Sequence, residues 1–389
     1  MWVRYESLGS TVRLVALPLL RERRMTRCLQ YKGMDVIRLT LCVSLARSLA
    51  RGAPTPLIVD TDIGGGGCRD VDDVLALSVA HALADQGLVQ LLAVVQNTQA
   101  PASTGVISVV NTYYGRHAVP VGVYRGTDLK DLQALSYVPD LVANWPSPVK
   151  NSSQVGSAVD LYRRVLASQR DGSVTVASIG LLTNLAALFH SGPDAHSALD
   201  GHALFARKVR RLAIMGGRYP SSGHAMCECN FCASAYGGLD HAAASRASSY
   251  AVDALPTMAS SVHVVFVGLG VGLEVVSGSR LSSCAPTSNP ARAALRDYEG
   301  APSKGRFSWD PITVVIASLG RIDGLERCEH CDGVNAVNGQ SGANGWLLGA
   351  FANQSYMVLR NATATTQALD QLLCQTPRAR RGLSIGDGR

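Results

Sequence analysis

The segment from residue 57 to residue 77 constrains the fold more than any other part of this 389-residue chain. An apolar strand, Leu-Ile-Val, ends there in aspartates and a glycine run, and an apolar helical pattern follows. Carboxylates packed this closely repel one another, and their pKa values rise until a cation neutralises them. Ca²⁺ and Mg²⁺ prefer such oxygen ligands. The clustered aspartates Asp60, Asp62, Asp70, Asp72 and Asp73 therefore predict a hard-cation site at a strand end.

Strands and helices alternate along the rest of the chain. Apolar runs at 89–97, 120–124, 174–179, 209–215 and 262–268 are typical of strands, and the first of them is continuous, as in strands buried on both faces. Helical patterns cover 71–86, 105–116, 155–169 and 182–190. This alternation predicts an α/β fold, with a mainly parallel, doubly wound sheet and helices on both faces. Residues 139–153 and 284–306 read as loops.

Basic residues are concentrated at the N-terminus. Residues 1–52 hold ten of the 36 Lys and Arg but three of the 29 Asp and Glu, which leaves 26 of each in the remainder. A balanced body does not indicate a nucleic-acid partner. We divide the chain into a basic leader (1–52), an α/β domain (53–376) and a disordered basic tail (377–389). The leader is a targeting segment, a disordered extension or translated sequence upstream of the true start, and its apolar run is too short and too charged for a membrane span.

Other strands also end in polar or glycine-rich motifs, and parallel strands bring such ends to one edge. In chain order these are Asn97, Gly180-Leu-Leu-Thr-Asn, Met215-Gly-Gly, Glu228-Cys-Asn and Trp309-Asp-Pro. Together with the aspartate cluster, they resemble the inosine-uridine-preferring nucleoside hydrolase family from about Leu57 to Leu373. The resemblance implies an α/β domain that binds one Ca²⁺ and hydrolyses the N-glycosidic bond of ribonucleosides. It also implies a small-molecule partner, the nucleoside, and often a homo-oligomer.

The resemblance assigns roles residue by residue. It implies that the metal ligands are the carboxylates of Asp62, Asp73 and Asp310 and the carbonyl of Ile179. It further implies that the substrate-binding residues are Asp72, Asn97, Met215, Glu228 and Asn230. The reaction passes through an oxocarbenium-like state and needs an activated water. Because calcium lowers the pKa of its bound water only moderately, we expect Asp62 to act as the general base.

Trp309 bears on the choice of base. In the resembled family, purine-specific members place Trp directly before the last metal aspartate, whereas pyrimidine-accepting members place His there. We therefore expect a purine-preferring hydrolase in which Trp309 is catalytic, stacking on the leaving base. Stacking from both sides requires a second aromatic ring, for which Tyr113 and Tyr114 are candidates. The alternative is a tryptophan that only packs against a helix N-terminus.

The spacing within the aspartate cluster departs from the family pattern. Nine residues, Ile63 to Val71, separate Asp62 from Asp72, and Gly66 to Arg69 look inserted. If the insertion loops outward, the metal site survives, whereas displacement of the following aspartates would abolish it. The second outcome predicts a catalytically silent, ligand-binding relative. Asp60-Thr-Asp also resembles haloacid-dehalogenase-like phosphatases, a further alternative.

The chain has ten cysteines, and five lie in two clusters. Cys227, Cys229 and Cys232 form one cluster, and Cys328 and Cys331 form the other. The hypotheses are a zinc site, disulfides within or between the clusters, or free thiols. Together with three Asn-x-Ser/Thr sequons, the cysteine content mildly favours a secreted or organellar protein over a cytoplasmic one.

Overall fold

The computed structural model describes residues 7–8, 11–12, 53–126, 129, 134–220, 227–233, 241–258, 262–349 and 353–380. The chain divides into two units, Met1–Ala53 and Pro54–Arg389. In the first unit, the short strands β1 (Ser7–Leu8) and β2 (Thr11–Val12) pair antiparallel. The predicted leader thus lies almost entirely outside the described residues. Among the described helices, none is long and apolar enough to cross a membrane.

A nine-stranded sheet forms the centre of the second unit, in the order β12-β15-β9-β8-β7-β3-β4-β5-β6. Every neighbouring pair is parallel except β12 with β15. The strands are β3 (Thr55–Thr61), β4 (Val89–Gln96), β5 (Val121–Val123), β6 (Gly156–Ser157), β7 (Val174–Ile179), β8 (Val209–Met215), β9 (His263–Val267), β12 (Leu325–Arg327) and β15 (Gln354–Leu359). Two smaller antiparallel pairs join β10 (Val276–Ser277) to β11 (Arg306–Phe307), and β13 (Gly333–Val337) to β14 (Asn344–Leu348).

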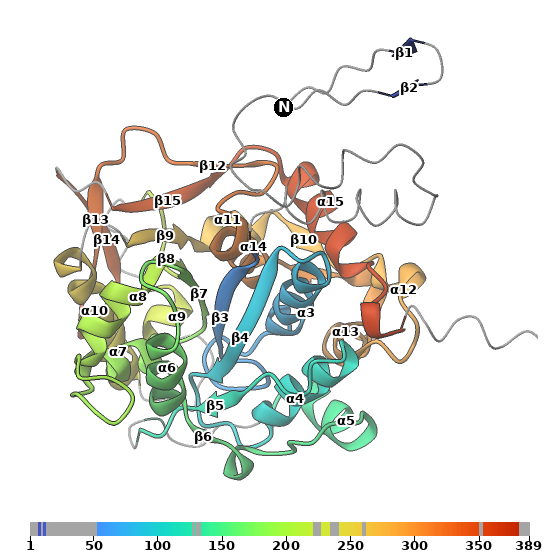
Figure 1. Ribbon diagram of the computed structural model, residues 1–389, viewed down its shortest axis with the longest axis horizontal. Helices are drawn as coiled ribbons and strands as arrows, with labels where there is room; N and C mark the ends of the chain where they lie inside the picture. Colours follow the sequence, from blue (N-terminus) through green and yellow to red (C-terminus); the bar gives the residue numbers. More distant parts are fainter. Residues whose placement is uncertain are drawn as a thin grey trace, which may run out of the picture. The chain divides into compact units, whose positions relative to one another are not determined.

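Helices cover both faces of this sheet (Figure 1). One layer contains α3 (Asp72–Asp85), α4 (Ser103–Tyr113), α5 (Tyr137–Asn144), α13 (Pro290–Glu299), α14 (Trp309–Leu319) and α15 (Ala362–Leu373). The other contains α6 (Ala158–Ala167), α7 (Thr183–His190), α8 (Gly201–Lys208) and α10 (His241–Ala254). The short helices are α9 (Cys229–Cys232), α11 (Leu269–Leu273) and α12 (Leu281–Cys284).

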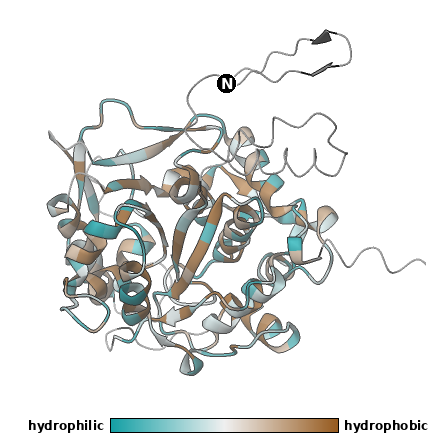
Figure 2. Ribbon diagram, in the orientation of Figure 1, coloured by the Kyte–Doolittle hydropathy of each residue, from teal (hydrophilic) through white to brown (hydrophobic). Residues whose placement is uncertain are grey.

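Two hydrophobic cores lie between the sheet and these layers, and the central ribbons in Figure 2 are accordingly mostly apolar. Strand β3 contributes side chains to both cores, because successive side chains of a strand point to opposite faces of the sheet. Leu57 and Val59 join the core under α3 and α14, whereas Ile58 joins the core under α6 and α7. The predicted doubly wound α/β fold is confirmed.

The order of the strands fixes where a ligand can bind. From β3 the chain proceeds through β4 and β5 to β6 at one edge, and it then returns to β7 on the other side of β3. Ligands of open α/β sheets bind at such a switch point, outside the carboxyl ends of the strands. The segments that follow β3 and β7 are those that carry Asp62 and Gly180.

Both segments predicted as loops contain a helix. Residues 139–153 include most of α5, and residues 284–306 include α13. The signals for α13 are visible in retrospect: the Asn289 side chain caps it, Pro290 occupies its first turn and Gly300 ends it in the left-handed region. The predicted disordered tail is also partly ordered, because Arg378–Arg380 form a 3₁₀ turn and the Arg378 N–H donates to Asp85.

Candidate active site

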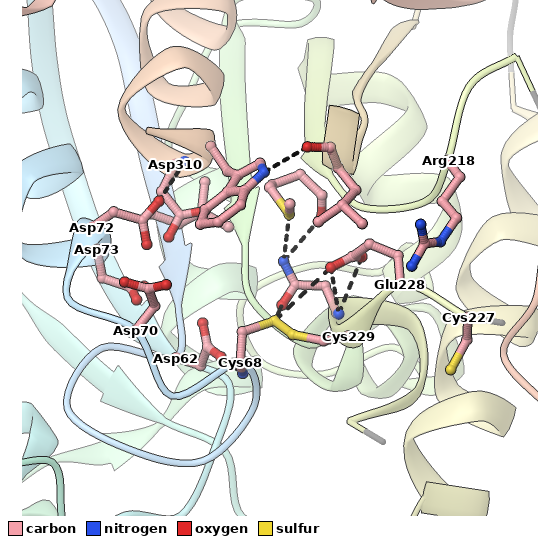
Figure 3. A pocket seen from close by; sticks show the side chains of 15 residues that line it. Asp62, Cys68, Asp70, Asp72, Asp73, Arg218, Cys227, Glu228, Cys229 and Asp310 are labelled. Carbon is pink, nitrogen blue, oxygen red and sulfur yellow. Dashed lines mark hydrogen bonds between the residues drawn. A yellow bond between two sulfur atoms is a disulfide. The ribbon is translucent and has the colours of Figure 1, made fainter. Parts of the chain in front are cut away.

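A cavity of about 370 Å³ opens at the switch point (Figure 3). Its walls come from the residues that follow β3, from the ends of β7 and β8, and from the starts of α3, α9 and α14. Every residue to which the family resemblance gave a role lines it except Asn97, and Asp60 of the aspartate cluster is also absent from the lining. Among the described residues, the lining is formed by Asp62, Cys68, Asp70, Asp72, Asp73, Ile179, Met215, Arg218, Cys227, Glu228, Cys229, Asn230, Leu269, Trp309 and Asp310.

Three carboxylates meet at one end of the cavity. Asp72 and Asp73 open α3, Asp310 lies in the first turn of α14, and their oxygens fall within 4.8 Å of one another. All three side chains are at least 95% buried. The Asp310 N–H donates to Asp72 Oδ2 at 3.1 Å, and Thr61 Oγ1 donates to Asp73. These contacts tie the two helix starts to the end of β3.

Burial raises the pKa of all three carboxyls well above the ordinary value, and repulsion between neighbouring aspartates raises it further. Three carboxylates this close together are unstable as free anions. They suit a hard divalent cation, which prefers carboxylate oxygens as ligands. The donor set therefore fits the metal site that the sequence predicts.

Two of the five clustered aspartates have structural roles instead. Asp60 lies beneath the cavity, fully buried, and accepts hydrogen bonds from Asn97, Asn184 and Tyr162. Asp70 reaches the cavity wall but forms an ion pair with Arg306 at 2.5 Å. Asp60 and Asp70 therefore have partners within the protein, in contrast to the three grouped carboxylates.

The insertion turns inward over Asp62. Gly64, Gly65, Gly66 and Gly67 all have positive φ, a path that glycine tolerates. This path brings the Cys68 N–H to 2.7 Å from Asp62 Oδ2, where it donates a hydrogen bond. Neither outcome expected for the insertion is found, since it does not loop outward and it leaves Asp72 and Asp73 beside Asp310. Burial raises the pKa of Asp62 to about 7.

Glu228, Asn230 and Met215 form the opposite wall. Glu228 caps α9 and accepts hydrogen bonds from the N–H groups of Gly217 and Asn230, each at 3.1 Å. Asn230 Nδ2 donates to the carbonyl and the sulfur of Met215 at 3.2 and 2.9 Å. Burial raises the pKa of Glu228 to about 7. These contacts fix the polar side chains in orientation, as a binding wall requires.

Trp309 packs against a helix and also lines the cavity. Its indole N–H donates to the Leu269 carbonyl at 2.7 Å, and a Cβ on Gly272 would overlap its ring, so it packs closely on α11. It nevertheless lines the cavity. Neither Tyr113 nor Tyr114 belongs to the described lining, so neither supplies the second aromatic ring. Tyr114 stacks on His81 instead, with ring centroids 4.8 Å apart.

Asn97 lies under the cavity floor. It is fully buried; its Nδ2 donates to Asp60 at 3.1 Å and its Oδ1 accepts from the Leu181 N–H at 3.1 Å. In this arrangement its amide is committed to joining β3, β4 and β7. Asn97 therefore lies outside the cavity lining, and the substrate contact that the resemblance implies stays a prediction.

The lining also contains residues that the sequence did not single out for the site, namely Cys68, Cys229, Cys227, Leu269 and Arg218. Arg218 follows the Gly-Gly of the third motif, but a lone arginine gave no signal. The cysteines gave one, because Cys68 stands in the insertion and Cys229 between Glu228 and Asn230.

All eight cysteines of residues 53–380 are paired. The disulfides are Cys68–Cys229, Cys227–Cys232, Cys284–Cys374 and Cys328–Cys331. Disulfides within the two clusters are among the expected alternatives, whereas the zinc hypothesis is not supported by these pairings. No sequence pattern indicated the bridge from Cys68 to Cys229.

Comparison with known proteins gives a consistent result. The model of the family described as "Inosine-uridine preferring nucleoside hydrolase" matches residues 57–331. "Uridine nucleosidase 1" of Arabidopsis thaliana is 27% identical over 181 residues, which are 44% of this chain and 48% of that protein. The chain thus matches about half the length of this relative.

Solved structures share the fold. "Plant nucleoside hydrolase - PpNRh1 enzyme" superposes with a TM-score of 0.58 at 18% identity, over 83% of this chain and all of that chain. "Inosine-Guanosine Nucleoside Hydrolase (IG-NH)" gives a TM-score of 0.59 at 16% identity, over 82% of this chain and 99% of that one. At these identities the likeness concerns the fold.

Proposed function

We propose that this chain, which belongs to the inosine-uridine preferring nucleoside hydrolase family, hydrolyses ribonucleosides to ribose and free base. One observation carries the proposal. Three buried carboxylates face Glu228 and Asn230 across a single cavity of about 370 Å³ at the switch point (Figure 3). A cavity of this size suits a small ligand, and its two walls suit a cation and a sugar.

The residues divide the chemistry between them. Glu228 and Asn230 hold the ribose hydroxyls, and Met215 packs against the sugar. Asp62 takes the proton of the attacking water as the general base. The water oxygen bonds to C1′ while the bond from C1′ to the base nitrogen breaks. The base leaves with a proton from solvent, and Asp62 returns to solvent the proton that it took from the water.

The metal in this proposal is Ca²⁺. Its ligand candidates are Asp62, Asp73, Asp310 and the Ile179 carbonyl, and the carboxylate group within 4.8 Å adds Asp72 to them. A bound Ca²⁺ would supply the positive charge that orients the water and the sugar hydroxyls. All of these donors are oxygens, which favours a hard cation over zinc.

Trp309 supports a purine preference. A stacked base is easier to protonate as it leaves, and no histidine lines the described part of the cavity to act as an acid in its place. The named plant relative is a uridine nucleosidase, so the comparison of inosine with uridine is the informative assay. Faster release of ribose from inosine supports the role of Trp309, and equal rates refute it.

Arg218 favours a second substrate class, nucleosides that carry a 5′-phosphate. It is the only basic residue in the described lining, and its buried Nε has no hydrogen-bond partner among the described groups. An unpaired buried donor is costly unless a ligand satisfies it. If this reading holds, inosine 5′-monophosphate has a lower KM than inosine, and Arg218→Gln removes the difference.

The alternatives make different predictions. A silent relative binds nucleoside without releasing ribose in the presence of Ca²⁺. The phosphatase hypothesis needs Asp60 as a nucleophile, but this side chain is fully buried and hydrogen-bonded beneath the cavity. A ribose-release assay with Ca²⁺ and with a chelator decides the matter. Asp73→Asn should lower turnover by at least about 100-fold, whereas exposed Asp323→Asn should not.

Two broader predictions accompany the function. The four disulfides support an oxidising compartment, either secreted or organellar. Mass spectrometry of the N-terminus of the mature protein would identify a removed targeting segment. The homo-oligomer implied by the family resemblance can be checked by light scattering.

A further inference from the structure

The disulfide between Cys68 and Cys229 crosses the cavity. It joins residues 161 apart in sequence, with their Cα atoms 5.6 Å apart, and both cysteines belong to the lining. One end lies in the insertion after β3, and the other lies in α9 between Glu228 and Asn230. In Figure 3 the bridge stands between the aspartates and the Glu228 wall. It therefore occupies the space between the two groups that the proposed reaction needs.

Cys68 also contacts the polar atoms of both walls. Its sulfur lies 2.9 Å from Asn230 Oδ1 and 4.0 Å from Glu228 Oε1. Its N–H occupies Asp62 Oδ2 at 2.7 Å. A disulfide sulfur carries no proton, so it excludes a sugar hydroxyl from Asn230 Oδ1 without replacing its hydrogen bond.

The remaining polar atom of Asn230 offers no alternative. Its Nδ2 is already bonded to Met215, so Oδ1 is the atom left to accept from a hydroxyl. Asp62 lies against the same residue, because one of its oxygens accepts from the Cys68 N–H. With the bridge in place, Cys68 thus blocks the sugar contact at Asn230 and is held over the expected base.

The blocking segment is short and anchored at both ends. Before it, the Gly64 N–H donates to Tyr137 Oη at 2.8 Å, and the Gly65 carbonyl accepts from Thr98 at 3.0 Å. After it, the Arg69 carbonyl accepts from Tyr298 at 2.9 Å. Gly66 and Gly67 lie between these anchors, and glycine has the greatest backbone freedom. Cutting the bridge thus frees the segment around Cys68 without loosening its ends.

We propose that Cys68 and Cys229 are a thiol–disulfide modification site that blocks the sugar-binding wall of the nucleoside cavity at Asn230 when oxidised and frees it when reduced. The proposal rests on the proposed hydrolase function. Both cysteines are partly exposed, so a dithiol reductant has access. A thiolate of the dithiol attacks one sulfur, the Cys68–Cys229 bond breaks and a mixed disulfide forms. The second thiol of the dithiol then displaces the remaining cysteine; two electrons and two protons pass to the protein and the dithiol becomes a disulfide.

The other disulfides provide controls. Cys284–Cys374 joins α12 to the end of α15, and neither cysteine belongs to the cavity lining. It resembles the bridge of interest in spanning distant segments, 90 residues apart. Removing it therefore tests whether reductant acts on stability in general or on this cavity.

The test uses the full chain, purified without reductant and supplied with Ca²⁺. Mass spectrometry of alkylated peptides verifies the Cys68–Cys229 link, and ribose release from inosine is measured before and after treatment with dithiothreitol. We expect reduction to raise turnover at least tenfold. We expect Cys68→Ser and Cys229→Ser to be active without reductant and to gain less than twofold from it. The Cys284→Ser/Cys374→Ser chain should still require reductant.

Several results would overturn the proposal: absence of the link, equal turnover of the linked and reduced chains, or turnover that falls on reduction. Two single variants that are folded by circular dichroism but inactive would also overturn it. If no form releases ribose, the hydrolase function fails and the modification site is judged by calorimetry with inosine. Binding at least tenfold tighter to Cys68→Ser than to the oxidised chain would then support it, and equal or absent binding would refute it.

Discussion

Replacement of Asp310 by Asn should stabilise the metal-free chain while weakening its response to calcium. The three carboxylates of Asp72, Asp73 and Asp310 lie within 4.8 Å of one another and are almost fully buried. In the absence of a cation they destabilise one another, so removing one charge relieves the other two. With a cation bound, the same charge is an attractive partner, and its removal lowers affinity.

The gain in unfolding free energy is limited by the smaller of two costs, the charge repulsion or the protonation of one carboxyl. Each pair of full charges at 4.8 Å repels by about 3.5 kcal/mol at an effective dielectric constant of about 20, so Asp310 accounts for about 7 kcal/mol. A carboxyl can instead take up a proton, which costs about 4.4 kcal/mol at pH 7 for an ordinary pKa of 3.8. Protonation is cheaper and therefore sets the limit. Asp310→Asn should gain up to about 4 kcal/mol, or roughly 5 to 6 °C in Tm for the unit Pro54–Arg389.

Differential scanning calorimetry at pH 7, with a chelator and with Ca²⁺, measures both effects. In chelator, Asp310→Asn should melt above the wild type, and saturating Ca²⁺ should raise the wild-type Tm but have little effect on the variant. Exposed Asp323→Asn serves as the matched control and should follow the wild type. If Asp310→Asn is no more stable in chelator, or still responds fully to Ca²⁺, the carboxylate group is not a cation site.

Other predictions concern pH, substrate and the remote disulfide. Burial raises the carboxyl pKa values in the folded chain, to about 7 for Asp62. The metal-free protein should therefore lose stability as the pH rises from about 4 to 7. A Tm that rises over this pH range in chelator would contradict this prediction. Glu228→Gln should raise KM by roughly 10- to 100-fold, as expected for a hydrogen bond to a charged group, and leave bound calcium unchanged by metal analysis; loss of calcium would move Glu228 to the metal shell. Trp309→Ala should weaken the reaction of inosine by about 1 to 3 kcal/mol, the range for base stacking, and an equal loss with uridine would indicate packing alone. Cys284→Ser/Cys374→Ser opens a loop of 90 residues and should lower the unfolding free energy by about 4 to 5 kcal/mol in urea titrations; an unchanged midpoint would show that the bridge does not constrain the unfolded chain.

Sequence patterns alone were sufficient for the fold and for most of the cavity lining. Periodicity identified the strands, because a strand buried on both faces, such as β4, needs a continuous apolar run. Their alternation with helices then required a mainly parallel sheet. Parallel strands end at one edge, so the sequence predicts one site for residues as distant as Asp73, Glu228 and Asp310.

Roles that depend on the hydrogen-bond partners of a side chain required the tertiary structure. The aspartates at 60, 70 and 73 are indistinguishable as letters, yet one is satisfied beneath the floor, one pairs with Arg306 and one joins the carboxylate group. The neighbours of Asn97, Tyr113 and Tyr114 are likewise set by tertiary contacts, which the local sequence does not encode.

The path of the insertion was also decided only in three dimensions. Four glycines permit many backbone paths, so local sequence could not choose between an outward and an inward loop. The inward path is held by contacts with partners far along the chain, Tyr137 and Cys229. The sequence by itself determined that these elements meet at one sheet edge, because strand periodicity is a local property. Which polar atoms remain available there was decided by tertiary structure, because hydrogen bonds and disulfides join residues that the sequence holds far apart.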